Sequence, residues 1–209
     1  VGVDLLATRH RGIGVRLHNL KDEFCMFVIA YEPYVKNDTN AHVTISSWRR
    51  IDDNVIPARG KVSGAYANSA LIKTDANRAG FDEALVLDNN GHVSEGSAMN
   101  IFMVRDGVLI TPPVTDNILE GITRRSIIEL ANKELGLTVL ERSIDRTEVY
   151  ICEELFMTGT AAQITAVTKI DHHPVGAGVM GPVTTKLRSM YEDVLRGKNK
   201  KYEHWNVAV

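Results

Sequence analysis

Two hairpin signals follow one another in the middle of the chain, and they limit the folds open to it. The first is Asn-Gly at 90–91, between the apolar run 85–87 and Val93. The second is Asp-Gly at 106–107, which also lies between two apolar runs. Such dipeptides readily supply the positive φ angles of a tight two-residue turn. Successive hairpins mixed with helices do not fit a regular βαβ alternation, so we predict an α+β fold.

Helical patterns follow the hairpins. Within residues 121–135, Ile127, Leu130 and Ala131 lie on one apolar stripe, and Gly136 is placed to end the helix. A last helix is predicted to begin at Pro182 and to direct five apolar side chains inward: Val183, Leu187, Met190, Tyr191 and Leu195.

Two strands are predicted before the hairpins. Residues 24–31 (FCMFVIAY) form a short apolar run with aromatic side chains, which predicts a buried strand. Residues 42–46 alternate, with Val43 and Ile45 on one face, and indicate a second strand. Between them, residues 36–40 (KNDTN) are rich in turn formers and are the best candidate for a linker.

Charge and hydropathy exclude several classes of partner. The net charge of −2, from 24 basic and 26 acidic residues among 209, gives no reason to expect a nucleic acid. No apolar run approaches the roughly 18 residues of a membrane span, so no membrane association is expected. The two cysteines, Cys25 and Cys152, lie far apart and favour a reducing, cytoplasmic location. His172 and His173 lack supporting Cys or acidic ligands, so no metal site is predicted.

Two side chains could carry chemistry. Lys61 is flanked by Gly60, Ser63 and Gly64, which would let a flat ring approach an amine. Glu95 lies in the segment SEGSAMN between the hairpins, where a carboxylate could face a cationic group. Taken alone, an ordinary surface lysine and an ordinary turn residue are the better interpretations.

Two further segments could bind an anion. Residues 121–125 (GITRR) begin a helix, whose free N–H groups and dipole attract negative charge. Residues 158–162 (TGTAA) follow a strand and offer backbone N–H groups in a turn without bulky side chains. The alternatives are a helix capped by Thr123 and a tight turn that needs small residues.

The order of these motifs is more specific than any one of them. A lysine, then SEGSxxN, then LxGITR before a helix, then TGTAA after a strand resembles the branched-chain aminotransferases of class IV, the fold type IV enzymes that use pyridoxal 5′-phosphate. The resemblance runs from SSWRR at 46–50 to the C-terminus. It implies the large domain shared with D-amino acid aminotransferases, a mixed sheet or pseudo-barrel with packed helices.

The resemblance also implies roles for individual residues. Lys61 matches the catalytic lysine that holds the cofactor as a Schiff base. Tyr66 matches the tyrosine that bonds the cofactor's phenolic oxygen, and Glu95 the carboxylate beside its pyridine nitrogen. Ala65 stands where many of these enzymes have Asn, which we expect to be tolerated.

The phosphate and substrate contacts follow in the same way. Ile122 and Thr123 match the phosphate contacts at a helix start, and Thr160 matches a turn threonine that also reaches the phosphate. The backbone N–H groups of Ala161 and Ala162 match those that bind the substrate carboxylate. The implied substrate-binding set is Tyr66, Thr160, Ala161 and Ala162.

The resemblance predicts two parts in the chain. Residues 1–38 are expected to be the end of an N-terminal small domain with its linker, most of that domain being absent from this sequence. Residues 39–209 are expected to be the large cofactor-binding domain. In the resemblance the small domain supplies an arginine to the phosphate and several substrate-facing side chains.

The implied activity is transamination of leucine, isoleucine and valine with 2-oxoglutarate. The partners expected are thus an amino acid, a 2-oxo acid and further copies of the chain in a homodimer or higher homo-oligomer. SSWRR and GPVT at 181–184 favour the branched-chain group. The alternatives are a D-amino acid or (R)-amine transaminase or aminodeoxychorismate lyase. A catalytically incompetent large-domain module is an alternative of another class.

Overall fold

The computed structural model describes residues 4–9, 18, 21–26, 30 and 34–207. Contacts divide the chain into two units, Val1–Tyr34 and Val35–Val209. The predicted boundary between residues 38 and 39 lies close to this division, and the assignment of the two units to domains stays a prediction.

The first unit contains a two-stranded antiparallel sheet. Strand β1, Asp4–Arg9, pairs with β2, Lys21–Met26, from Asp4 opposite Met26 to Arg9 opposite Lys21. The strand predicted at 24–31 therefore begins earlier, and residues 27–29 and 31 lie outside the described residues. Phe24 is 66% exposed, so its predicted burial is wrong. Two strands alone leave both faces of a sheet open.

The second unit is built on one mixed sheet of nine strands within the described residues. Its strands are β3 Ala41–Arg49, β4 Glu83–Leu87, β5 Val93–Gly96, β6 Asn100–Arg105, β7 Val108–Thr111, β8 Val139–Glu141, β9 Glu154–Gly159, β10 Gln163–Ile170 and β11 His173–Pro174. The order is β5-β4-β3-β10-β9-β6-β7-β8, with β11 on β10. The pairs β10–β3, β3–β4 and β7–β8 are parallel and the others are antiparallel.

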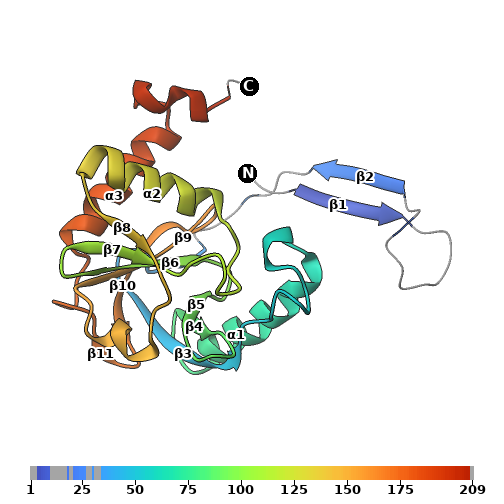
Figure 1. The fold of residues 1–209 in the computed structure, drawn as a ribbon, viewed down its shortest axis with the longest axis horizontal. Coiled ribbons are helices and arrows are strands. Elements are labelled where there is room, and N and C mark those ends of the chain that lie inside the picture. The colour runs from blue at the N-terminus through green and yellow to red at the C-terminus, as the bar shows by residue number, and fades with distance from the viewer. Residues whose placement is uncertain (1–3, 10–17, 19–20, 27–29, 31–33, 208–209) are drawn as a thin grey trace. The chain divides into compact units, whose positions relative to one another are not determined.

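Three α-helices cover this sheet: α1 Tyr66–Arg78, α2 Ile122–Leu135 and α3 Pro182–Leu195. Helix α1 packs on β3 and β4, whereas α2 and α3 lie side by side against β9 (Figure 1). Short 3₁₀ helices add η1 Ala58–Gly60, η2 Ser63–Ala65, η3 Arg146–Tyr150 and η4 Lys200–Trp205. The α+β prediction is confirmed.

The predicted helices form, but one side chain of α3 that was predicted to face inward does not. Ile127, Leu130 and Ala131 of α2 are buried, and Gly136 ends that helix with φ +62°. In α3, Leu187 and Tyr191 are buried, as predicted. Leu195 is 44% exposed, and Val194 is buried in its place. Positions 187, 191 and 194 follow the i, i+4, i+7 spacing of one helix face, which residue 195 leaves.

One of the two hairpins has the predicted tight turn. Asp106 and Gly107 adopt φ +51° and +71° between β6 and β7. Between β4 and β5, Gly91 has φ +89°, but Asn90 does not have a positive φ. The amide of Gly91 donates to the carbonyl of Asp88, and the Asp88 carboxylate accepts from the amides of Asn90 and His92. That carboxylate therefore organises a longer loop than the dipeptide predicted.

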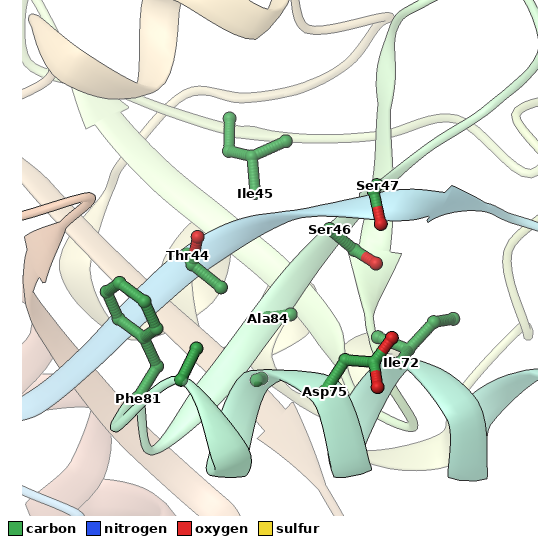
Figure 2. Close-up of a pocket in the computed structure, with 10 residues that line it drawn as sticks. Thr44, Ile45, Ser46, Ser47, Ile72, Asp75, Phe81 and Ala84 are labelled. Carbon is green, nitrogen blue, oxygen red and sulfur yellow. The ribbon is translucent and has the colours of Figure 1, made fainter.

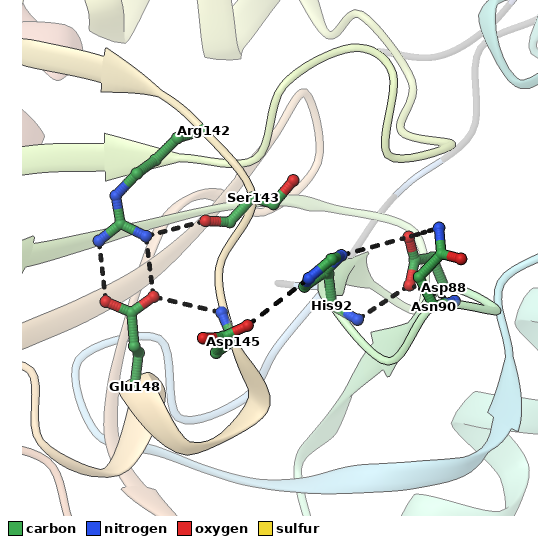
Figure 3. A network of polar contacts seen from close by, with 7 residues as sticks. All are labelled: Asp88, Asn90, His92, Arg142, Ser143, Asp145 and Glu148. Atoms are coloured by element: carbon green, nitrogen blue, oxygen red, sulfur yellow. Dashed lines mark hydrogen bonds and ion pairs between the residues drawn. The ribbon is translucent and has the colours of Figure 1, made fainter.

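A polar network fastens η3 to the sheet (Figure 3). The Glu148 carboxylate accepts two hydrogen bonds of 2.8 Å from the Arg142 guanidinium and one of 3.2 Å from the amide of Asp145. It also pairs with Arg105, and its side chain is only 13% exposed. These bonds, those from Arg142 above all, lower the pKa of Glu148 from 4.5 to about 2.

We expect Glu148→Gln to destabilise the fold in a pH-dependent way. Because the folded pKa is depressed, ionised Glu148 stabilises the chain fully above about pH 4.5, and this contribution disappears as the pH falls towards 2. The shift corresponds to at most about 3 kcal/mol. Urea unfolding at several pH values measures it, with the exposed pair Glu129–Lys133 and the variant Glu129→Gln as a control expected to lose about 0.5 kcal/mol. Equal pH slopes in wild type and Glu148→Gln would contradict this account.

Candidate active site

A buried carboxylate lies at the centre of the candidate site. Glu95, on β5, is 2% exposed. Its Oε1 lies 2.7 Å from an Nη of Arg50. Its Oε2 accepts from the Asn100 side-chain amide at 3.1 Å and from the Leu119 amide at 3.3 Å. Burial raises the pKa of Glu95 to about 7, while Arg50, Leu119 and Asn100 oppose that rise.

Asn100 joins three elements at this carboxylate. It lies on β6, opposite Thr158 of β9. Its side-chain amide donates to the Leu119 carbonyl at 2.8 Å as well as to Glu95. A Cβ built on Gly121 would lie 2.2 Å from Asn100 Oδ1, so α2 starts against this side chain. The end of β9, the carboxylate on β5 and the start of α2 therefore meet at Asn100.

The start of α2 has no side-chain cap. Gly121 is the N-cap residue, and the first turn holds no acidic side chain. The alternative in which Thr123 caps the helix is therefore wrong. The Thr123 hydroxyl lies 3.3 Å from that of Tyr191 on α3, and its side chain is buried, whereas Ile122 is 73% exposed. The N-cap residue therefore provides no side-chain acceptor for the N–H groups of this turn, where the helix dipole places partial positive charge.

Lys61 stands between η1 and η2 in the left-handed region, with φ +47°. Its side chain is exposed, and it makes no hydrogen bond or ion pair with any residue that the structure describes. Arg59 connects this segment to the start of α2, because its guanidinium binds Glu120 at 2.7 Å and the Val114 carbonyl at 3.3 Å. A left-handed backbone at a non-glycine residue costs about 1–2 kcal/mol.

Tyr66 begins α1 and is 39% exposed. Burial raises its pKa, the charge of Glu95 adds to that rise, and the charge of Arg50 opposes it. Tyr66 therefore lies within electrostatic reach of both members of the buried ion pair, and its hydroxyl is protonated at neutral pH.

Residues 160–162 form the turn between β9 and β10. Thr160 and Ala161 are exposed and Ala162 is buried, with Gln163 at φ +52°. The Ala162 carbonyl accepts from the Thr165 hydroxyl at 3.2 Å. A Cβ on Gly159, just before the turn, would lie 3.6 Å from Met99, in the same segment as Glu95 and Asn100. The turn thus lies next to the carboxylate site.

Three residues of this arrangement were not predicted: Arg50, Asn100 and Asn117. Asn100 lies in the same motif, SEGSAMN, as Glu95, which is a signal for this contact, whereas nothing in the sequence links Arg50 of SSWRR to Glu95. Asn117 has φ +59°, and its carbonyl accepts from Arg50 Nε at 3.1 Å. Asn tolerates this conformation better than most residues, which is the one sequence signal available for Asn117.

Two hollows lie elsewhere. One, of about 210 Å³, lies between β3 and α1, and Thr44, Ile72, Asp75 and Phe81 are among the residues that line it (Figure 2). Another of about 440 Å³ is lined by Tyr150, Asp171, His173 and Pro174. No predicted site residue lines either one. Among the described residues, no cluster of three potential His, Cys, Asp or Glu metal ligands exists. No helix of the described residues has the length and apolarity to cross a membrane.

We expect Gly121→Ala to disturb the carboxylate site. The new methyl group would overlap Asn100 Oδ1, so Asn100 would have to release Glu95 or Leu119. Such overpacking costs about 1–3 kcal/mol of stability. Chemical unfolding of Gly121→Ala and Gly64→Ala provides the comparison, because a Cβ on Gly64 lies an ordinary 3.8 Å from Ile56. Equal stability of the two variants would show that the contact is unimportant.

Comparison with known proteins defines the family. The family model described as amino-transferase class IV matches residues 2–170. A probable branched-chain-amino-acid aminotransferase of Aquifex aeolicus is 45% identical over 194 residues, which are 93% of this chain and 62% of that protein. The chain belongs to the class IV aminotransferase family.

Solved structures show the same relationship. The branched-chain aminotransferase of the archaeon Thermoproteus uzoniensis with norvaline has a TM-score of 0.87 and 39% identity, covering 94% of this chain and 64% of that one. The branched-chain amino acid aminotransferase of Thermobaculum terrenum in its PLP-form, the holo-form, has a TM-score of 0.85 and 40% identity, covering 90% and 61%. These structural neighbours are fold type IV aminotransferases, so the prediction that the chain has this fold is confirmed. The chain spans less than two thirds of the length of each of these relatives.

Proposed function

We propose that the protein containing this chain transaminates branched-chain amino acids with 2-oxoglutarate and uses pyridoxal 5′-phosphate. The observation that carries the proposal is the buried Glu95 carboxylate, which lies where the start of α2, the turn after β9 and the Lys61 segment come together. The names of the relatives support the substrate class, and the PLP-form of one of them supports the cofactor.

The residues of the site fit this cofactor. Glu95 offers a buried acceptor to a protonated ring nitrogen, and protonated Tyr66 can donate to the phenolic oxygen. The open N–H groups of Ile122 and Thr123 and the exposed Thr160 turn suit a phosphate. Lys61 is an exposed amine without a competing partner among the described residues. When bound, the cofactor supplies an electron sink for the bond broken at the substrate carbon.

The chain's own residues then carry the remaining steps. Lys61 would hold the cofactor covalently, and its free amine would move a proton between two neighbouring carbon atoms as a general base and acid. Glu95 holds the proton on the ring nitrogen. The backbone amides of Ala161 and Ala162 orient the substrate carboxylate, and the phosphate contacts fix the distance over which the proton moves.

A spectral titration tests the proposal. The protein that contains this chain should develop a visible absorption band with pyridoxal phosphate, and L-leucine should remove the band and yield a 2-oxo acid. D-alanine should leave the band unchanged. A response to D-alanine instead would favour a D-amino acid transaminase, and no band at all would favour an incompetent module. Either result contradicts the proposal.

We further propose that the protein works as a cytoplasmic homodimer. Two cysteines, one of them free and buried, suit a reducing compartment. Exposed apolar side chains on the Lys61 side of the chain, Val55, Val62 and Ile122, offer surface for further contacts. Light scattering should give twice the mass of one copy of the protein that contains this chain, and a monomer at micromolar concentration would contradict the dimer.

A further inference from the structure

The Glu95 carboxylate has one acceptor position left. A carboxylate can accept about four hydrogen bonds, two at each oxygen. Asn100 and Leu119 occupy both positions of Oε2, and the Arg50 guanidinium lies 2.7 Å from Oε1 in an ion pair that covers one side of that oxygen. Among the described residues, no donor takes the second position of Oε1. Oε1 of this buried carboxylate therefore keeps one lone pair that can still accept a hydrogen bond.

Arg50 is itself fixed from two sides. Its backbone amide, immediately after β3, donates to the Leu87 carbonyl at 2.9 Å. Its Nε donates to the carbonyl of Asn117. The Asn117 side chain in turn donates to Asp52 at 2.9 Å and accepts from the Asp53 amide at 3.2 Å. Hydrogen bonds to its backbone and its side chain therefore hold Arg50 in place beside Glu95, and Arg50 is only 7% exposed.

Stability alone does not explain this pair. Removing two charges from water costs several kcal/mol per ion, and their attraction often does no more than offset that loss. Tyr66 is a second titratable group in electrostatic reach of Glu95. Without Arg50, the buried carboxylate would favour its neutral acid form, which would present a donor where an acceptor is needed.

We propose that Arg50, held in place by Asn117, is a positioning residue that favours the ionised form of Glu95 and directs the remaining lone pair of Oε1 to a ring N–H of the ligand. This assignment rests on the proposed function, because it takes the ligand to be a protonated pyridine. An ionised Glu95 leaves the proton on the ring nitrogen, whereas a more basic Glu95 would take it.

The test follows the charge of Glu95 in the chain without cofactor. In protein labelled with ¹³C-glutamate, the Glu95 carboxyl signal is the one missing from Glu95→Gln. Its titration midpoint in wild type is expected near pH 7. Arg50→Met should raise the midpoint by about one pH unit or more, and Arg50→Lys, which retains the charge, should keep it near wild type. Arg142→Met, which disturbs Glu148 instead, should leave Glu95 unchanged.

Two results would overturn the proposal. One is the same midpoint in wild type and Arg50→Met. The other is an equal rise in Arg50→Lys, since packing rather than charge would then be responsible. If circular dichroism shows Arg50→Met unfolded, Arg50→Gln replaces it, because that side chain can still donate to Asn117; a midpoint equal to that of wild type would again contradict the role.

A second arm separates this proposal from the function itself. Pyridoxal phosphate labelled with ¹⁵N in the ring should show a protonated nitrogen in the wild-type chain and a shift towards neutral pyridine in Arg50→Met. Failure of the wild type to bind this probe would count against the proposed function while leaving the Glu95 titration intact. A bound probe whose nitrogen is unchanged in Arg50→Met would overturn the positioning role alone.

Discussion

Lys61→Ala is expected to abolish transamination and the visible absorption band of the bound cofactor. The lysine has two tasks in the account, covalent attachment and proton transfer, and alanine can perform neither. General acid–base catalysis alone contributes about 10²–10⁴-fold, so activity should fall by at least about 10²-fold, and the loss of covalent attachment should lower it further. The substitution removes an exposed side chain without partners among the described residues, so the fold should remain. Activity, absorbance and thermal unfolding measure the three effects.

Lys186→Ala is the matched control for Lys61→Ala. Lys186 is an exposed lysine on α3, outside the candidate site. This variant should keep wild-type activity and absorbance. Activity in Lys61→Ala within about tenfold of the control would remove Lys61 from the chemistry.

Glu95→Gln is expected to retain cofactor binding but to lower turnover by about a hundredfold or more. An amide cannot hold the ring nitrogen protonated, and removing one buried electrostatic group of this kind commonly costs about 10²–10³-fold. The variant also leaves Arg50 without its anionic partner, which destabilises the fold because a buried charge becomes unpaired. Turnover at saturating substrate and cofactor affinity should be measured together.

The double variant Glu95→Gln/Arg50→Met separates the two effects of that substitution. It removes the unpaired charge and should recover part of the lost stability, yet turnover should remain low. Unchanged turnover in Glu95→Gln at saturating substrate would exclude Glu95 from the mechanism. A return of turnover together with stability in the double variant would show that the loss came from the fold.

Local signals were enough to predict much of the fold. Asp106-Gly107 determines its own turn, and the stripe of α2 with Gly136 determines that helix, because both depend on neighbours in the sequence. The parallel pairing of β3 with β10 was not predictable, since it joins strands more than a hundred residues apart. The loop at 88–92 was mispredicted because the Asp88 carboxylate accepts hydrogen bonds from the amides of Asn90 and His92. These bonds stabilise a longer loop than the Asn-Gly dipeptide predicts.

The candidate site was predictable by residue type but not by geometry. The order of the motifs points to Lys61, Tyr66 and Glu95, while their individual patterns are weak. The guanidinium on Glu95 comes from Arg50, forty-five positions away, and its brace comes from Asn117. Such contacts depend on the assembled sheet and on one left-handed residue. Their roles remain predictions for the experiments described.

Borohydride reduction followed by peptide mapping tests the central claim most directly. The protein that contains this chain is incubated with pyridoxal phosphate, reduced and digested, and the modified peptide is identified by mass spectrometry. The account predicts a phosphopyridoxyl group on Lys61 as the dominant product. A dominant product on any other lysine, or no modified peptide under saturating cofactor, would contradict it.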